Sequence, residues 1–560
     1  MKTNSDEMHN QEMVLKKIRQ SSEVFDKLAN SYEVWVPESG WLAGRRNRDK
    51  NDSKRKNLTD WSILSFLLEI DNCHYPMADS YLQYGIDGVI RIAAETLETL
   101  KNNLQSELQD QTQLDIAYLE SLLHVWKRFR QFVADHMVLA LECAKQETSD
   151  TKKKRYEKIA KICQNLTINK PNTFCEALQL FWFTYLFRSP FGAGCIGRLD
   201  QLLYPFYKHD CEMGIWDQQE AEKMLEEMFT RMNEINTGDT LRNLMLSGQD
   251  AKGNDQTNEI TYLILVAYEN TGGSEPHLNV RFHEKTPKKL RDNCINMLSS
   301  GSGQPTIYFD EAVLPAMEKA GICHEDACQY ANDGCTETVI AGKSAIVFWQ
   351  YEMVKTVELT LFGGNENPCV KPVSMKKNSI HGVDFVPKTN LLIGIESKKT
   401  QELTTFSEFL SAFFEQMDHQ LDHYFLMIKQ KMQEDQTVSI TSPFTAGTFE
   451  KCLRTGKDPL RGGGFDITNY QLLSGSIGTA ADCLYAIQSA VYEKKLVTME
   501  ELIKALSVDF EGYEVLRQQL LHLPKYGNDK KEVDCRSFSG ACQCFSWTRE
   551  YTVVSWSVQH

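Results

Sequence analysis

The sequence predicts an α/β fold in which helices surround a parallel sheet. Three neighbouring segments lead to this prediction. Residues 277–283 alternate between polar and apolar side chains like a half-buried strand, residues 287–298 have the apolar spacing of a helix, and residues 305–309 are again strand-like. Strands separated by helices are typical of parallel sheets, because the chain must cross over a face of the sheet between parallel strands.

The segments before this alternation are predicted to be mainly helical. Residues 1–60 are polar and weakly periodic, and we expect them to be partly loose. Residues 61–165 carry apolar side chains three or four positions apart, such as Leu119, Leu122 and Trp126, which is the spacing of a helix face. Apolar spacing and start signals predict four further helices, at 174–187, 217–235, 311–320 and 347–361. A loop at 332–337 is expected before the last of them.

The composition narrows the class of protein and excludes several partners. With 560 residues, of which 42% are hydrophobic, the chain can bury a large core. A net charge of −15 argues against nucleic-acid and anionic-membrane partners, and the basic residues between 45 and 56 are interleaved with Asp and Asn, as in a solvated loop. No apolar run approaches the roughly 18 residues of a membrane helix. The 16 cysteines lack disulfide-framework spacing and no signal peptide precedes them, so we expect a cytoplasmic protein with free thiols.

Residues 332–337, Asn-Asp-Gly-Cys-Thr-Glu, are the strongest candidate for a reactive site. Cys335 and Glu337 are two positions apart, and residues i and i+2 of an extended chain point to the same side. A carboxylate can transfer protons, and a cysteine sulfur can act as a nucleophile, a metal ligand or a radical. The alternative is structural, because a lone cysteine is usually a small buried apolar residue.

Further blocks follow one another along the chain at residues 171–179, 197–205, 246–259, 280–283, 301–311, 462–465, 481–487 and 524–529. Together with Gly334-Cys335-Thr336-Glu337, and in this order, they resemble the glycyl radical enzymes, the family that includes pyruvate formate-lyase. The resemblance covers about residues 60–534. A single block would be weak evidence, but the common order of all of them is specific.

The resemblance implies a fold and a division into domains. The family fold is a ten-stranded barrel of two half-barrels surrounded by helices, and we expect an incomplete form of it here. The expected parts are a polar N-terminal segment (1–60), a pyruvate formate-lyase-like catalytic barrel domain (61–534) and an unrelated tail (535–560). The family ends in a domain whose Arg-Val-x-Gly-Tyr loop carries the radical. The one Arg-x-x-Gly-aromatic match, residues 461–465, lies in an earlier block, which implies that the chain is truncated before the glycyl radical domain.

The resemblance also implies a chemistry for Cys335 and Glu337. In this family, an iron–sulfur activating enzyme that uses S-adenosylmethionine installs a glycyl radical, which turns the active-site cysteine into a thiyl that takes hydrogen from the substrate. Pyruvate formate-lyase has two adjacent cysteines, whereas Thr336 follows Cys335 here. A Cys-x-Glu loop resembles the dehydratases and lyases of the family, in which the carboxylate would accept a proton. Relatives often have proline after the glutamate, and Thr338 at that position leaves the substrate open.

Structural alternatives remain for each candidate residue. Glu337 could cap a following helix or pair with Lys343. Asp333 could tune Glu337, bind substrate or cap a turn. His277 is a candidate substrate-binding residue on its strand, although a histidine on a strand is more often structural.

Two further pairs of residues are assigned no part in the chemistry. We expect Arg198 and Asp200 to form a buried ion pair. The Cys-x-Cys of the tail, Cys542 and Cys544, is too short a pattern to predict a metal site. We therefore expect no metal site and no bound cofactor.

The sequence leaves three functions open. The first is the catalytic part of a glycyl radical lyase that eliminates a group from a small hydroxylated substrate. It would need the activating enzyme and a glycyl-radical-bearing partner chain, and would form a homodimer. The second is an inactive, truncated remnant. The third is formate C-acetyltransferase-like activity, as in pyruvate formate-lyase.

Overall fold

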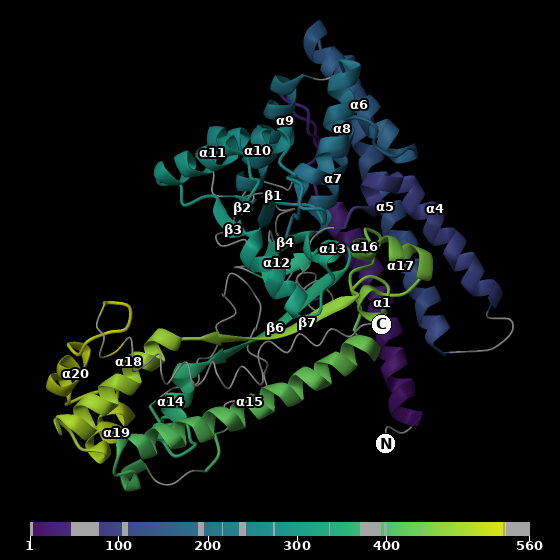
Figure 1. The fold of residues 1–560 in the computed structure, drawn as a ribbon. Coiled ribbons are helices and arrows are strands. Elements are labelled where there is room, and N and C mark those ends of the chain that lie inside the picture. Colours follow the sequence, from purple (N-terminus) through teal and green to yellow (C-terminus); the bar gives the residue numbers. More distant parts are fainter. Residues whose placement is uncertain are drawn as a thin grey trace. The chain divides into compact units, whose positions relative to one another are not determined.

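The computed structural model describes most of the chain, and its residues form two compact units (Figure 1). Of the described residues, the first unit contains those up to 346 together with 435–469, and the second contains those in 347–434 and from 470 on. The described residues are 4–45, 66, 78–103, 110–188, 195–215, 217–234, 242–272, 275–334, 337–369, 394–396, 400–437, 439–529 and 533. The expected boundaries at residues 60 and 534 stay predictions, and the tail 535–560 lies outside the described residues.

Helices predominate in the first unit. Its N-terminal half contains α1 (Asn4–Ser31), α4 (Ser80–Asn103), α5 (Asp110–Gln146), α6 (Asp150–Ile168), α7 (Phe174–Arg188), α8 (Leu199–Met213) and α9 (Gln218–Glu234). The rest contains α10 (Glu259–Thr271), α11 (Lys288–Ser299), α12 (Asp310–Lys319), α13 (His324–Ala327), α16 (Pro443–Ala446), α17 (Glu450–Thr455) and the 3-10 turn η2 (Pro459–Arg461).

The first part of the N-terminal segment, which we expected to be partly loose, is regular. Residues 4–31 form the long helix α1, which packs against α5, and residues 46–60 lie outside the described residues. Val14, Ile18, Phe25 and Leu28 are almost completely buried, and their spacing of three, four or seven positions forms one apolar face. The many charged residues between these positions weaken the overall apolar signal of the segment, which explains why its periodicity was underestimated.

The first unit contains a three-stranded parallel sheet. Strands β1 (Asn243–Ser247), β2 (His277–Phe282) and β3 (Thr306–Phe309) are adjacent and parallel. Helix α10 connects β1 to β2 and α11 connects β2 to β3, and both helices lie along one side of the sheet (Figure 1). The predicted parallel sheet with helical connections is therefore confirmed.

The remaining strands form two smaller sheets. Strands β4 (Tyr330–Asp333) and β5 (Glu337–Ile340) form an antiparallel hairpin, so residues 332–337 are not simply a loop between helices. The predicted helix 347–361 is wrong in its first half, because β6 (Ser344–Glu352) continues to residue 352 and pairs with β7 (Ile467–Gly475). Its run of β-branched and aromatic residues favours a strand. The described residues thus show an α/β fold with sheets of three, two and two strands, and the ten-stranded barrel stays a prediction.

The second unit is built mainly from helices. They are α14 (Met353–Leu361), the 3-10 turn η1 (Thr400–Glu402), α15 (Phe406–Thr437), α18 (Ile477–Ile487), the π-helical turn η3 (Gln488–Glu493), α19 (Met499–Ser507) and α20 (Glu514–Leu521). Among the helices that the structure describes in either unit, none is both long and apolar enough to cross a membrane.

Candidate active site

The predicted reactive segment forms the turn of the β4–β5 hairpin. Asp333 and Glu337 are the last pair of its ladder, and Gly334 directly follows Asp333. Gly334 has a left-handed φ of +56°, and a Cβ at this position would lie 2.5 Å from Oε2 of Glu337. The Glu337 carboxylate therefore folds over Gly334, in space that only a glycine leaves open. Cys335 and Thr336 lie outside the described residues.

Two buried asparagines connect this loop to the parallel sheet. Asn243 of β1 donates its Nδ2 hydrogen bond to the carbonyl oxygen of Gly334, at 2.7 Å. Asn279 of β2 in turn donates to Oδ1 of Asn243, at 2.9 Å. Both asparagines are 2% exposed. Because a buried amide that loses its partner is costly, this short chain of hydrogen bonds holds the backbone at residue 334, directly before Cys335 in the sequence.

The other end of β4 is attached to the sheet by charged groups. Arg281 of β2 donates to both carboxylate oxygens of Asp310, at 2.8 and 2.9 Å, and both side chains are fully buried. The same guanidinium donates to the carbonyl oxygen of Cys328, at 2.8 Å. It also lies 4.1 Å from the ring centre of Tyr330, whose hydroxyl donates to Asp310 at 3.0 Å. This bidentate, charge-assisted arrangement anchors the strand that leads to the loop.

The expected ion pair between Arg198 and Asp200 is wrong. No ion pair joins them in the described structure, because each side chain binds neighbouring uncharged groups instead. Arg198 donates to the carbonyl oxygens of Cys328 and Ser247, at 3.3 and 2.9 Å. Asp200 accepts from the Ser247 amide and the Thr261 hydroxyl, both at 2.8 Å. Burial lowers the pKa of Arg198 to about 10 and raises the pKa of Asp200. Arg198 thus provides a second support for residue 328.

The structure also argues against the structural alternatives for Glu337. Residues 337–340 form strand β5, so no helix follows that Glu337 could cap. Lys343 forms its ion pair with Asp326. The Glu337 side chain is half-buried at the hairpin turn.

Asp333 lies directly across the hairpin from Glu337. Opposite residues of an antiparallel pair place their side chains on the same face, so the two carboxylates are neighbours. Asp333 is 1% exposed. Burial raises the pKa of the Cys195 thiol, and the Asp333 carboxylate raises it further, which means that Asp333 lies near this cysteine.

His277 lies close to the supports of the loop. It is the register partner of Asn243 on the neighbouring parallel strand, so both side chains point to the same face of the sheet. His277 is half-buried. By contrast, His283 binds the Asp255 carboxylate at 3.0 Å and is buried, which is a structural role. The structure therefore brings Asp333, Gly334 and Glu337 together and places His277 beside the residue that binds the loop.

Sequence reasoning missed Asn243, Asn279 and Arg281 as supports of the loop. A signal was present, because positions 277, 279, 281 and 283 of the strand are all polar. We interpreted this alternation as a solvent-facing side. The structure buries it, and the polar face carries the hydrogen bonds and ion pair that hold the loop.

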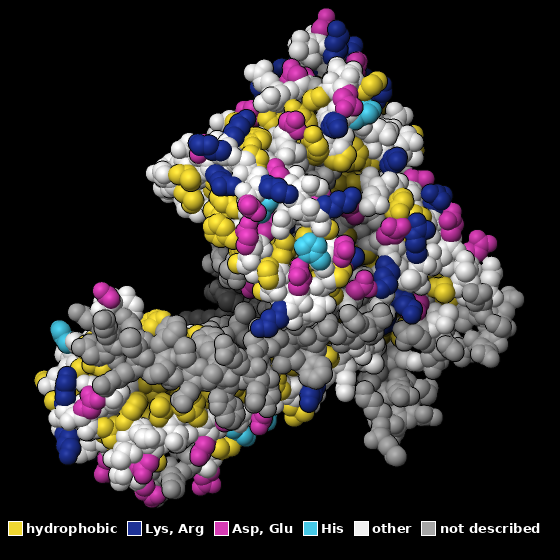
Figure 2. Space-filling model, in the orientation of Figure 1, with side chains coloured by type: hydrophobic (Ala, Val, Ile, Leu, Met, Phe, Trp, Pro, Cys, Tyr) yellow, Lys and Arg dark blue, Asp and Glu magenta, His cyan; other side chains and the backbone are white. Residues whose placement is uncertain are grey.

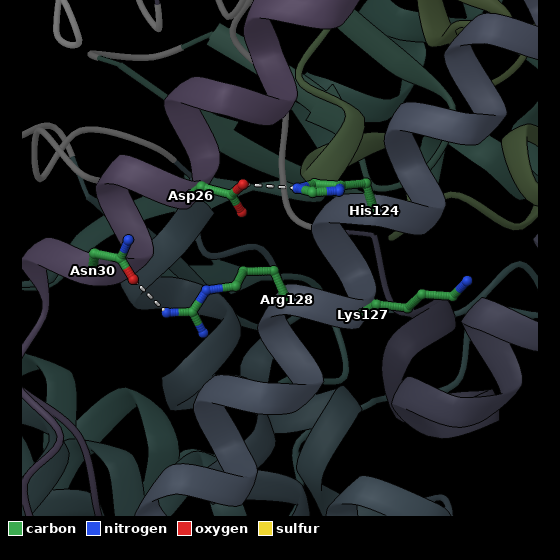
Figure 3. Close-up of a pocket in the computed structure, with 5 residues that line it drawn as sticks. All are labelled: Asp26, Asn30, His124, Lys127 and Arg128. Atoms are coloured by element: carbon green, nitrogen blue, oxygen red, sulfur yellow. Dashed lines mark hydrogen bonds and ion pairs between the residues drawn. The ribbon is translucent and has the colours of Figure 1, made fainter.

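A separate, open pocket of about 450 Å³ lies between α1 and α5 (Figure 3). Its lining side chains largely pair with one another: His124 with Asp26 at 2.9 Å, and Arg128 with Asn30 at 2.8 Å. Lys127 completes the lining. On the face shown in Figure 2, basic and acidic side chains are intermixed. None of the predicted site residues lies in this pocket.

Solved structures with the same fold define the class of protein. The B12-independent glycerol dehydratase from Clostridium butyricum matches with a TM-score of 0.72 and 21% identity, over 94% of this chain and 73% of that one. A glycyl radical enzyme from Archaeoglobus fulgidus matches with a TM-score of 0.73 and 21% identity, over 96% of this chain and 74% of that one. At these identities the likeness shows the fold, which is that of the glycyl radical enzymes.

Sequence comparison identifies the family. Residues 72–539 match the family described as Pyruvate formate lyase-like, and the chain belongs to this family of glycyl radical enzymes. It is 32% identical to trans-4-hydroxy-L-proline dehydratase from Clostridioides difficile, over 70% of this chain and 50% of the relative. It is 28% identical to isethionate sulfite-lyase from Oleidesulfovibrio alaskensis, over 74% and 50%. The chain spans about half the length of the curated relatives it matches.

Proposed function

We propose that this chain carries the catalytic residues of a glycyl radical lyase that eliminates a leaving group from a small hydroxylated substrate. The observation that supports this most strongly is the hairpin turn, where the Glu337 carboxylate folds over Gly334, directly before Cys335 in the sequence. The likeness to a dehydratase and a sulfite-lyase agrees with elimination rather than acyl transfer. In this sequence Thr336 stands where pyruvate formate-lyase has the second of its two adjacent cysteines, so the pair used for acyl transfer is missing.

The proposed reaction divides the chemistry between two side chains. The thiyl form of Cys335 takes a hydrogen atom from the carbon that bears the substrate hydroxyl, which leaves a thiol and a carbon radical. Glu337 accepts the hydroxyl proton, and the leaving group on the neighbouring carbon departs with its bonding electron pair. The resulting carbon radical, now next to a carbonyl, takes the hydrogen atom back from the Cys335 thiol. The net result is a carbonyl product and the released leaving group with its proton.

A glycyl radical, installed by an S-adenosylmethionine-dependent activating enzyme, supplies the oxidation of the thiol in this family. The glycine-rich segment 461–465 is a poor candidate for that radical, because it forms a packed turn. A Cβ at Gly463 would lie 2.0 Å from the carbonyl oxygen of Lys457. We therefore propose that the radical-bearing glycine lies outside the 560 residues, on a longer form of this chain or on another chain. The homodimer and the cytoplasmic location stay predictions.

The proposal is tested by anaerobic reconstitution. The chain is mixed with a family activating enzyme and a glycine-loop protein, and the radical is followed by electron paramagnetic resonance. Turnover is screened with isethionate and 1,2-propanediol, which carry a leaving group on the carbon next to the hydroxyl-bearing carbon, and with two controls: ethanesulfonate, which lacks the hydroxyl group, and 1-propanol, which lacks the leaving group. We expect a radical signal and elimination from at least one hydroxylated compound.

Three variants assign the roles. Cys335→Ala should abolish turnover, and Glu337→Gln should lower kcat about 100-fold or more without changing the radical signal, because only proton transfer is lost. Cys323→Ala is the matched control, because Cys323 is an exposed free thiol, and its replacement should leave turnover unchanged. Turnover by the Cys335→Ala variant would refute the proposed mechanism.

A further inference from the structure

Helix α6, which packs along α5 (Figure 1), carries a dense group of basic side chains. Residues 152–161 contain six basic residues and one acidic residue, although the whole chain has a net charge of −15. The basic residues are Lys152, Lys153, Lys154, Arg155, Lys158 and Lys161. The buried residues of α6, such as Tyr156, Ile159 and Cys163, lie on the other side of the helix. The basic group is therefore a feature of the surface and not of the core.

Two of these cations have contacts within the chain, and four do not. Arg155 donates to the carbonyl oxygen of Glu38, and the Lys158 ammonium lies 4.8 Å from the ring centre of Trp41. The remaining four are the exposed residues Lys152, Lys153, Lys154 and Lys161. None of these four forms an ion pair with a residue in the described ranges of the chain. Two of them lie in the first turn of α6, where the helix dipole makes a cation unfavourable, so the stability of the helix does not explain the group.

Three of the lysines form a line along the exposed side of α6, which we call the lysine stripe: Lys154, Lys158 and Lys161. They are four and three residues apart, so they lie about one turn from each other on one side of the helix and span about 10 Å. Like charges at this spacing repel each other by roughly 0.2–0.5 kcal/mol per pair. The one carboxylate within the run, Glu157, is exposed and forms no ion pair with them in the described structure. A partner of opposite charge would relieve this repulsion.

We propose that the lysine stripe binds an acidic helix of a partner protein. Carboxylates that are four and three residues apart on such a helix have the same spacing as the lysines, so each lysine can pair with one carboxylate. A nucleic acid or an anionic membrane fits less well, because its charge extends far beyond the stripe and would face other parts of a chain with a net charge of −15. The inference goes beyond the proposed function and does not depend on it, since no residue of the β4–β5 hairpin takes part.

The test is a binding measurement with synthetic peptides, and it needs no radical. One fluorescein-labelled, alanine-rich peptide carries glutamates four and three residues apart along one side of its helix. A second peptide has the same composition, with the glutamates distributed around the helix. In fluorescence anisotropy at low salt, the aligned peptide should bind the native chain about 10-fold more tightly than the scrambled peptide. Added salt should weaken this binding, because the paired groups are exposed.

Charge reversals locate the binding surface. Lys154→Glu combined with Lys161→Glu should weaken binding of the aligned peptide about 10-fold or more, because two attractive contacts become repulsive. Lys494→Glu combined with Lys495→Glu is the matched control: both lysines are exposed, the net charge changes by the same amount, and binding should change less than about 2-fold. Lys154→Gln combined with Lys161→Gln removes the charges without repulsion and should give an intermediate loss. Circular dichroism and Tm verify that each variant is folded.

Three results would overturn the inference. If the aligned peptide does not bind, or binds no better than the scrambled peptide, the stripe does not recognise a helix. Equal weakening by the two pairs of reversals would show that only the net charge of the chain matters. Tighter binding of a single-stranded oligonucleotide or of phosphatidylserine vesicles than of the aligned peptide would assign the stripe to another class of partner.

Discussion

The two ends of the segment from Cys328 to Gly334 are held by contacts of different kinds. At the first end, two arginines and Asp310 bind residues 328 and 330 through several charge-assisted hydrogen bonds. At the second end, a hydrogen bond from Asn243 supports Gly334, and Asn332 beside it has no hydrogen-bond partner among the described residues. We infer a division of labour, in which the contacts at the first end stabilise the strand and the contact at the second end positions the backbone that precedes Cys335 in the sequence. Changes at the two ends should therefore affect different properties.

The largest effect is expected at the first end. Arg281→Met leaves the buried Asp310 carboxylate without its cation, and we expect a loss of about 3–5 kcal/mol in the free energy of unfolding, measured by urea denaturation. Arg454→Met is the control, because its pair with Glu450 is exposed, and its effect should be small. If Arg281→Met behaved like the control, the anchoring role of the first end would be wrong.

A smaller loss of stability is expected for the support of the second end. Asn243→Ala removes the side chain that donates to the Gly334 carbonyl, and the Asn279 amide keeps only its hydrogen bond to the His277 carbonyl, which should cost about 1–3 kcal/mol in total. The loop then loses its support, so the kcat of Asn243→Ala should fall by a larger factor than the kcat of Arg281→Met. Both variants are assayed at a temperature at which they are folded. The measurements are urea denaturation and the reconstituted turnover assay. Equal kcat values for the two variants would contradict the division of labour.

The smallest effect on stability is expected at the loop itself. Gly334→Ala and Gly301→Ala both place an alanine at a positive φ, which should cost about 1–2 kcal/mol in each case. Only at Gly334 does the new Cβ meet the Glu337 carboxylate, whereas Gly301 has nothing within 4 Å. Gly334→Ala should therefore also lower kcat, while Gly301→Ala should not. Similar kcat values for both would show that the position of the Glu337 carboxylate is unimportant.

Local patterns predicted much of the fold. The helices α7, α9, α11 and α12 and the strands β2 and β3 lie within a few residues of their predicted bounds. In these segments apolar spacing, start signals and burial agree. The errors occurred where the local signals conflict. In α1, charged residues obscured the apolar face, and in β6 the start of a strand was assigned to the helix that follows it.

The sequence alone was sufficient to predict the family and to name the candidate thiol and carboxylate. The short motifs that carry the resemblance, and their order, can be read directly from the sequence. The partners of buried polar groups were decided by the tertiary structure. Asn243, Asn279 and Gly334 are far apart in the chain, and nothing local in the sequence indicates that they share hydrogen bonds. Their contacts, and the burial of the Asn332 amide, exist only because β1, β2 and the β4–β5 hairpin pack together and exclude water.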